Sequence, residues 1–197
     1  MAVSLTVLKE ATRETRVAAT PETVKKMSGL GISVTVEAGA GAASGFTDAA
    51  YKAAGATLTK AVSAALKKSD VVMGVRAPSA ANVKAMKANA VLIATLNPYQ
   101  NGAQVKSYAA AKIQAMSMEL MPRITRAQSM DVLSSQSNLS GYKAVLDATH
   151  EYGRALPMMM TAAGTIPAAR IFVMGAGVAG LQAIATAKRL GAIVSAT

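Results

Sequence analysis

Short apolar runs alternate with helix-like runs along the first 118 residues of the chain. The segment 32–37 alternates apolar and polar positions, which is the period of a half-buried strand, while 70–75 and 90–95 are almost continuously apolar, as buried strands are. Strands are therefore expected over 4–8, 32–37, 70–75, 90–95 and 113–118, and helices over the segments that begin at 21, 48, 62, 79 and 104. Because strands and helices alternate, the pattern predicts an α/β fold in which a parallel sheet carries helices on both faces.

Two of these helices have a clear start signal. Thr20 is followed by Pro21 and Glu22, so a capping hydroxyl precedes a proline at the first helical position and an acid in the first turn. Thr47 and Asp48 repeat the capping residue and the acid. The sequence therefore predicts that Thr20 and Thr47 are N-caps.

The pattern changes after residue 120 and then restarts. A long helix is expected over 139–155, after which Pro157 interrupts the chain. A strand over 170–174, a helix over 178–190 and a strand over 192–197 follow, which is the first βαβ of a Rossmann-type subdomain. The expected domains are a first α/β subdomain, a connector helix and an incomplete Rossmann subdomain, over 1–137, 138–163 and 164–197.

Composition narrows the chemistry. The 197 residues include 21 lysines and arginines against 10 aspartates and glutamates, a formal charge of +11, but the basic residues are dispersed and aromatics make up only 4%. No nucleic-acid partner is therefore expected. The absence of cysteine and the presence of a single histidine exclude a thiolate metal site, an iron–sulfur cluster, a thiol nucleophile and a multi-histidine metal centre, so no metal site is expected.

The apolar composition raises the question of a membrane span. The segment 171–187 is uncharged over 17 residues, but it contains three glycines and suits a buried strand followed by a helix. No spanning helix and no signal peptide are expected, which points to the cytoplasm.

The segment 175–180 reads G-A-G-V-A-G and lies between an apolar strand and a helix. This context is what a dinucleotide-binding turn requires: the first glycine permits the turn, the second lets backbone approach the diphosphate, and the third lets helix and strand pack closely. A glycine-rich turn without a ligand is the alternative. The acid that binds the adenosine ribose lies about 20 residues on in such folds, beyond Thr197, so the chain is expected to be incomplete and weak or inactive alone.

Several segments resemble one enzyme family. Lys9–Glu10 and Arg13 to Pro21, with 37–41, resemble the start shared by alanine dehydrogenases and the NAD(H)-binding component of proton-translocating NAD(P) transhydrogenase. The stretch 118–138 looks like the transhydrogenase branch specifically, and 175–191 is similar too.

The resemblance implies a function. NAD(H) binds this component, hydride passes directly to NADP(H) on a partner component, and a membrane component couples the transfer to proton translocation. It also implies a homodimer located in the cytoplasm and held peripherally at the inner membrane by its partner subunits. No catalytic acid or base is expected. The cofactor-binding residues that it implies are Arg123, Gln128 and Asp131 at the nicotinamide, Ser134 near its ribose, and Gly175, Gly177, Val178 and Gly180 at the diphosphate.

Two alternatives remain. An alanine dehydrogenase needs acid–base side chains, and that family uses a lysine and a histidine where this chain has 75–78 (V-R-A-P) and 95–98 (T-L-N-P), so the transhydrogenase branch is favoured. The chain is otherwise a non-catalytic assembly fragment, with Arg123, Gln128 and Asp131 as polar residues that cap the next helix. The methionines at 158–160 are expected to pack, and His150 to be structural.

Overall fold

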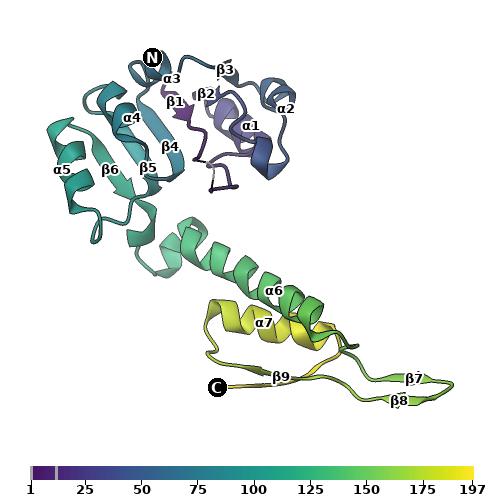
Figure 1. Ribbon diagram of the computed structural model, residues 1–197. Coiled ribbons are helices and arrows are strands. Elements are labelled where there is room, and N and C mark those ends of the chain that lie inside the picture. Colours follow the sequence, from purple (N-terminus) through teal and green to yellow (C-terminus); the bar gives the residue numbers. More distant parts are fainter. Residues whose placement is uncertain (1, 12) are drawn as a thin grey trace. The chain divides into compact units, whose positions relative to one another are not determined.

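The N-terminal region of the chain forms one sheet of six parallel strands flanked by helices (Figure 1). The computed structural model describes residues 2–11 and 13–197. The chain divides into two compact units, Met1–Met121 and Pro122–Thr197. The expected domain boundaries after residues 137 and 163 stay predictions.

The first unit follows the alternation that the sequence predicts. Its strands are β1 (Ser4–Val7), β2 (Ser33–Glu37), β3 (Thr57–Thr59), β4 (Val71–Arg76), β5 (Val91–Thr95) and β6 (Gln114–Ser117). Its α-helices are α1 (Pro21–Gly29), α2 (Asp48–Ala53), α3 (Val62–Leu66), α4 (Ala80–Ala85) and α5 (Gly102–Ala110), with short 3₁₀ turns η1 (Ala42–Ser44) and η2 (Met118–Leu120).

The strand order is β3-β2-β1-β4-β5-β6, so the chain runs outward from β1 in one direction and from β4 in the other. Two buried clusters accompany this reversal. One joins Val24 and Tyr51 of α1 and α2 to β1 and β2, and the other joins Val83 and Tyr108 of α4 and α5 to β4 and β5. The predicted α/β class with a helix-flanked parallel sheet is confirmed.

Hydroxyl caps start three of these helices. The hydroxyl oxygen of Thr20 accepts from the N–H of Thr23 at 3.2 Å, and that of Thr47 accepts from Ala50 at 3.2 Å. Both predicted caps are confirmed, and Ser79 caps α4 in the same way at 3.2 Å. Each cap satisfies a backbone donor that the first turn leaves without a partner.

The second unit contains a long helix, a hairpin and a βαβ unit. Its elements are η3 (Thr125–Met130), α6 (Val132–Tyr152), β7 (Met159–Thr161), β8 (Gly164–Ile166), β9 (Arg170–Val173), α7 (Val178–Arg189) and β10 (Ile193–Ala196). Strands β9 and β10 pair in parallel, which confirms the predicted βαβ. Helices α6 and α7 pack together through a small cluster in which Val145, Ala187 and Ala192 are buried.

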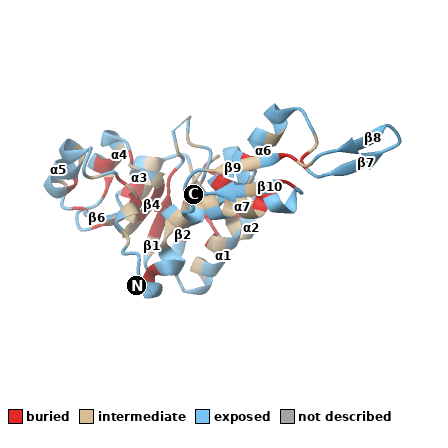
Figure 2. Ribbon diagram, turned by 90° about the horizontal axis from the view of Figure 1, so that it is seen from below, coloured by how far each residue is buried: buried red, intermediate tan, exposed pale blue. Residues whose placement is uncertain are grey.

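The second unit also corrects three expectations. The long helix begins at Val132, seven residues before the predicted start, and ends at Tyr152. The segment after Pro157 is the antiparallel hairpin β7–β8 rather than a simple interruption. Its methionines do not pack: Met158, Met159 and Met160 are 63%, 44% and 82% exposed, and the whole hairpin is exposed in Figure 2.

A search of the described residues for a bilayer-crossing helix finds none with the required length and hydropathy.

Candidate functional site

The turn between β9 and α7 depends on two glycines. Gly175 has φ +94°, a backbone conformation that side chains with a Cβ rarely adopt. A Cβ on Gly180 would lie 1.8 Å from the carbonyl oxygen of Gly175, so no larger residue fits there without moving backbone. These two positions hold the strand and the helix in the tight turn that the sequence predicts.

Gly177, between them, is different. Its backbone is extended (φ −77°, ψ −168°) and it is the N-cap of α7 with no side-chain cap hydrogen bond. A Cβ there would meet nothing within 4 Å. The protein itself therefore leaves this space open, beside a first helical turn whose N–H groups are free to bind an anion.

A cavity of about 370 Å³ opens at this helix end. All the residues that line it belong to the second unit: Arg123, Ser134, Ser137, Met174, Gly175, Gly177, Val178, Ala179 and Gly180. The cavity thus brings together six of the eight predicted cofactor residues, which come from the segment before α6, from α6 itself and from the glycine turn. The guanidinium of Arg123 and the N-terminus of α7 both favour a negatively charged ligand.

The two other predicted residues lie beside the cavity lining. Asp131 is the N-cap of α6: its carboxylate accepts from the N–H of Ser134 at 2.9 Å and from the Ser134 hydroxyl at 2.6 Å. These bonds, with a smaller contribution from the charge of Arg123, lower the pKa of Asp131. Gln128 lies in η3 with an exposed side chain. Asp131 therefore fixes the rotamer of Ser134, which does line the cavity.

Sequence reasoning missed Ser137. It follows Ser134 by three residues on α6 and lines the same cavity. The i, i+3 spacing places two hydroxyls on one helix face. That signal becomes readable only when the helix is known to start at Val132.

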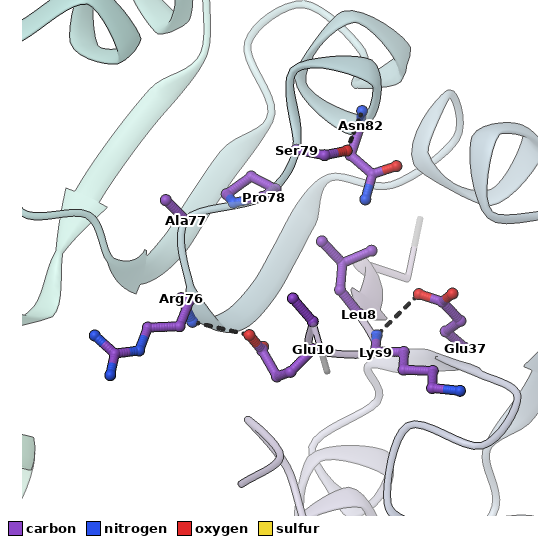
Figure 3. A pocket seen from close by; sticks show the side chains of 10 residues that line it. Leu8, Lys9, Glu10, Glu37, Arg76, Ala77, Pro78, Ser79 and Asn82 are labelled. Atoms are coloured by element: carbon purple, nitrogen blue, oxygen red, sulfur yellow. Dashed lines mark hydrogen bonds between the residues drawn. The ribbon is translucent and has the colours of Figure 1, made fainter. Parts of the chain in front are cut away.

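The first unit has a second crevice, shown in Figure 3, at the carboxyl ends of β1 and β4. This is the point where the strand order reverses, the usual ligand position in open α/β sheets. Its cavity of about 260 Å³ is lined by Leu8, Lys9, Glu10, Ala11, Glu37, Arg76, Ala77, Pro78, Ser79 and Asn82.

The charged groups of this crevice are largely paired within the protein. The Glu10 carboxylate accepts from the backbone N–H groups of Val75 at 2.6 Å and Arg76 at 3.1 Å, and the Arg76 guanidinium donates to Glu14 at 2.9 Å. Burial raises the pKa of Glu10 above its ordinary value. The hydrogen bond from Arg16, assisted by Arg76, lowers the pKa of Glu14 to about 2.

The fold and the glycine turn are shared with a known protein family. The N-terminal domain of "Alanine dehydrogenase/PNT" matches residues 6–140. The chain belongs to this family. The C-terminal alanine dehydrogenase/PNT domain matches residues 144–197, which include the glycine turn.

Within the alanine dehydrogenase/PNT family, the chain is more similar to transhydrogenases than to alanine dehydrogenases. It is 56% identical over 189 residues to the first of the separately encoded parts of NAD(P) transhydrogenase subunit alpha from Rhodospirillum rubrum, across 93% of this chain and 49% of that protein. The alanine dehydrogenase of Halomonas elongata is 29% identical across 92% of this chain and 49% of that protein. The predicted resemblance to the transhydrogenase branch is confirmed, and the chain spans about half the length of these curated relatives.

A solved structure supports the same relationship. The transhydrogenase from Sinorhizobium meliloti superposes with a TM-score of 0.93 and 57% identity, covering 98% of this chain and 58% of that chain. An L-alanine dehydrogenase structure superposes with a TM-score of 0.83 at 24% identity, covering 98% of this chain and 54% of that chain, which shows the shared fold.

Proposed function

We propose that this chain is the NAD(H)-binding part of a proton-translocating NAD(P) transhydrogenase. The observation that carries the proposal is the cavity at the N-terminus of α7, where Arg123 and Ser134 meet the glycine turn. It combines an open position at Gly177, helix-end amides and a cation, which suits a dinucleotide diphosphate. In this proposal the bound NADH supplies a hydride, which passes directly to NADP⁺ on a partner component.

Each predicted residue has a role in this proposal. A nicotinamide carboxamide offers one acceptor and two donors, so Arg123 donates to it, Asp131 accepts from it and Gln128 does both. Ser134 lies near the adjoining ribose, and Gly175, Gly177, Val178 and Gly180 meet the diphosphate. These contacts fix the rotation of the ring, and hydride transfer depends strongly on orientation.

No general acid or base is required of this chain. Exchange of a hydride between two nicotinamides moves no proton at the reacting carbons, so a side chain that titrates near neutral pH has no task there. The crevice of the first unit is consistent with this, because Arg76 is paired with Glu14 and the segments 75–78 and 95–98 contain neither lysine nor histidine.

The remaining proposals concern the assembly. NADP(H) is held on a partner component, and a membrane component couples hydride transfer to proton translocation. The chain works as a homodimer on the cytoplasmic side of the inner membrane, held there by its partner subunits. The relatives named as subunits support the existence of such partners.

Titration with NADH tests the binding role. In the complete gene product, followed by nicotinamide fluorescence, we expect Arg123→Ala to raise the Kd for NADH about tenfold, because it removes a charged hydrogen-bond donor from the cavity. Arg126→Ala is the matched control: this arginine lies in η3, three residues on, with an exposed side chain that does not line the cavity. We expect its Kd to stay within about twofold of the wild-type value.

Two outcomes would contradict the proposal. If the complete protein does not bind NADH, the chain is an assembly module. If alanine and NAD⁺ yield pyruvate, the chain is part of an amino-acid dehydrogenase.

A further inference from the structure

One face of α6 lies along α7 over its whole contact. Ser134, Ser137, Gly141 and Val145 are spaced by three, four and four residues, so they share one side of the helix. Val145 is buried in the cluster with Ala187 of α7, and the two serines line the cavity at the start of α7. The same face therefore packs against α7 at one end and borders the cavity at the other.

Gly141 sets how closely the two helices approach. A Cβ on Gly141 would lie 2.0 Å from the carbonyl oxygen of Ala179 and 3.0 Å from its Cα. Any side chain at this position must push apart α6 and the first turn of α7, because the obstacle is backbone. Ser137 lies one turn before Gly141, so this contact fixes its distance from the N–H groups of Val178, Ala179 and Gly180.

The two serines of this face differ in what they can still donate. The Ser134 hydroxyl gives its proton to Asp131, so it can only accept from a ligand. Among the described residues, the Ser137 hydroxyl has no side-chain hydrogen-bond partner. Phosphate oxygens are acceptors and require donors; of the two hydroxyls, Ser137 is the one that can supply one.

We propose that the Ser137 hydroxyl donates a hydrogen bond to the dinucleotide diphosphate, alongside the amides of the first turn of α7, at a distance set by Gly141. This inference rests on the proposed NAD(H)-binding function. It assigns Ser137 to the diphosphate, while Ser134 with its proton committed to Asp131 suits the ribose hydroxyls, which can donate to it.

The experiment compares NADH with ADP-ribose, which keeps the diphosphate and lacks nicotinamide. In the complete gene product we expect Ser137→Ala to raise the Kd of both ligands by a similar factor of about tenfold, the size of one charge-assisted hydrogen bond. Ser137→Thr keeps the hydroxyl and should stay within about threefold of wild type. Ser140→Ala, on an exposed position of the same helix, is the control and should change neither Kd.

The outcomes separate this inference from the function on which it rests. If the wild type binds both ligands and Ser137→Ala changes neither Kd, the inference is wrong and the function stands. If Ser137→Ala weakens NADH alone, the hydroxyl acts at the nicotinamide half and the inference is again wrong. A wild type that binds neither ligand overturns the proposed function, and the inference with it.

The role of Gly141 is tested by a double-mutant cycle. Gly141→Ala should raise the Kd of ADP-ribose in the wild-type background, and by a smaller factor when Ser137 is already alanine, because part of its effect acts through that hydroxyl. Equal factors in both backgrounds would show that Gly141 is only structural. The serine variants remain decisive if Gly141→Ala does not fold.

Discussion

The glycines of the β9–α7 turn are required for different physical reasons. Gly175 supplies a positive φ, and Gly180 leaves room for the carbonyl of Gly175. Gly177 meets neither condition, since its φ is negative and its Cβ direction is empty. Folding thus explains two of the three glycines, and the ligand explains the third.

This difference can be measured with two alanine variants. Gly180→Ala should lower the free energy of unfolding by about 1–3 kcal/mol, because its Cβ overlaps backbone. Gly177→Ala should leave the free energy of unfolding within about 0.5 kcal/mol of wild type, yet raise the Kd for NADH about tenfold by filling the space of the diphosphate. Urea unfolding and NADH titration of both variants provide the check. Wild-type affinity in Gly177→Ala would mean that the ligand does not approach this backbone.

The candidate site could be predicted from the sequence only in part. The glycine turn is readable because three glycines at fixed spacing follow an apolar strand. The placement of Ser137 is not, because the segment from Val132 to Asn138 lacks an apolar period and most of its residues are exposed. What starts the helix there is the carboxylate of Asp131, a cap that the sequence shows but that a search for apolar positions passes over.

At the scale of elements, carboxylates tie the N-terminal segment to the end of β4. Glu14 is 11% exposed and receives hydrogen bonds from Arg16 at 2.7 Å and Arg76 at 2.9 Å. Glu10 accepts from the backbone N–H groups at the same strand end. The loop after β4 is therefore held by carboxylates that lie 62 and 66 residues before Arg76 in the chain.

These two carboxylates should affect acid stability with opposite signs. The pKa of Glu14 is lowered from 4.5 to about 2 in the folded state, so its stabilisation is present above pH 4.5 and is lost as the pH falls toward 2. Glu14→Gln should therefore reduce the loss of unfolding free energy between pH 5 and pH 2. Burial raises the pKa of Glu10, so protonation favours the folded state, and Glu10→Gln should make the loss steeper. Urea unfolding across this pH range is the measurement; an unchanged pH profile in Glu14→Gln would contradict the pairing.

The elements with strong local signals are those that the sequence predicts well. Thr20 and Thr47 cap where expected, and β4 and β5 lie within one residue of the predicted strands. The short strand β3 escapes prediction, because three residues give too little periodicity. The hairpin β7–β8 escapes it too, because its six residues are all exposed and carry no buried face to create a pattern.

At the scale of the whole molecule, the two units differ in how much core they have. The first unit has six strands in one sheet and two buried clusters among its described residues. The second has two sheets of two strands each and one cluster of three buried residues. A two-stranded sheet is at best marginally stable by itself in water.

We therefore expect the units to behave differently when expressed separately. A fragment of residues 1–121 should unfold cooperatively in urea, because it contains a complete sheet with helices packed on it. A fragment of residues 122–197 should show a broad transition without cooperativity. Circular dichroism of both fragments against urea is the measurement, with the undivided chain as the reference. A cooperative transition of the second fragment would show that α6 and α7 suffice for a stable core.

The exposed hairpin β7–β8 has a consequence for the chemistry of the surface. Methionine oxidation follows the exposure of the thioether, and Met158 to Met160 are open to solvent while Met86 is 7% exposed. Peroxide therefore reaches the hairpin sulfurs first and converts an apolar tip into a polar one through sulfoxide formation. A chain without a single cysteine still carries oxidisable sulfur, concentrated on one projecting pair of strands.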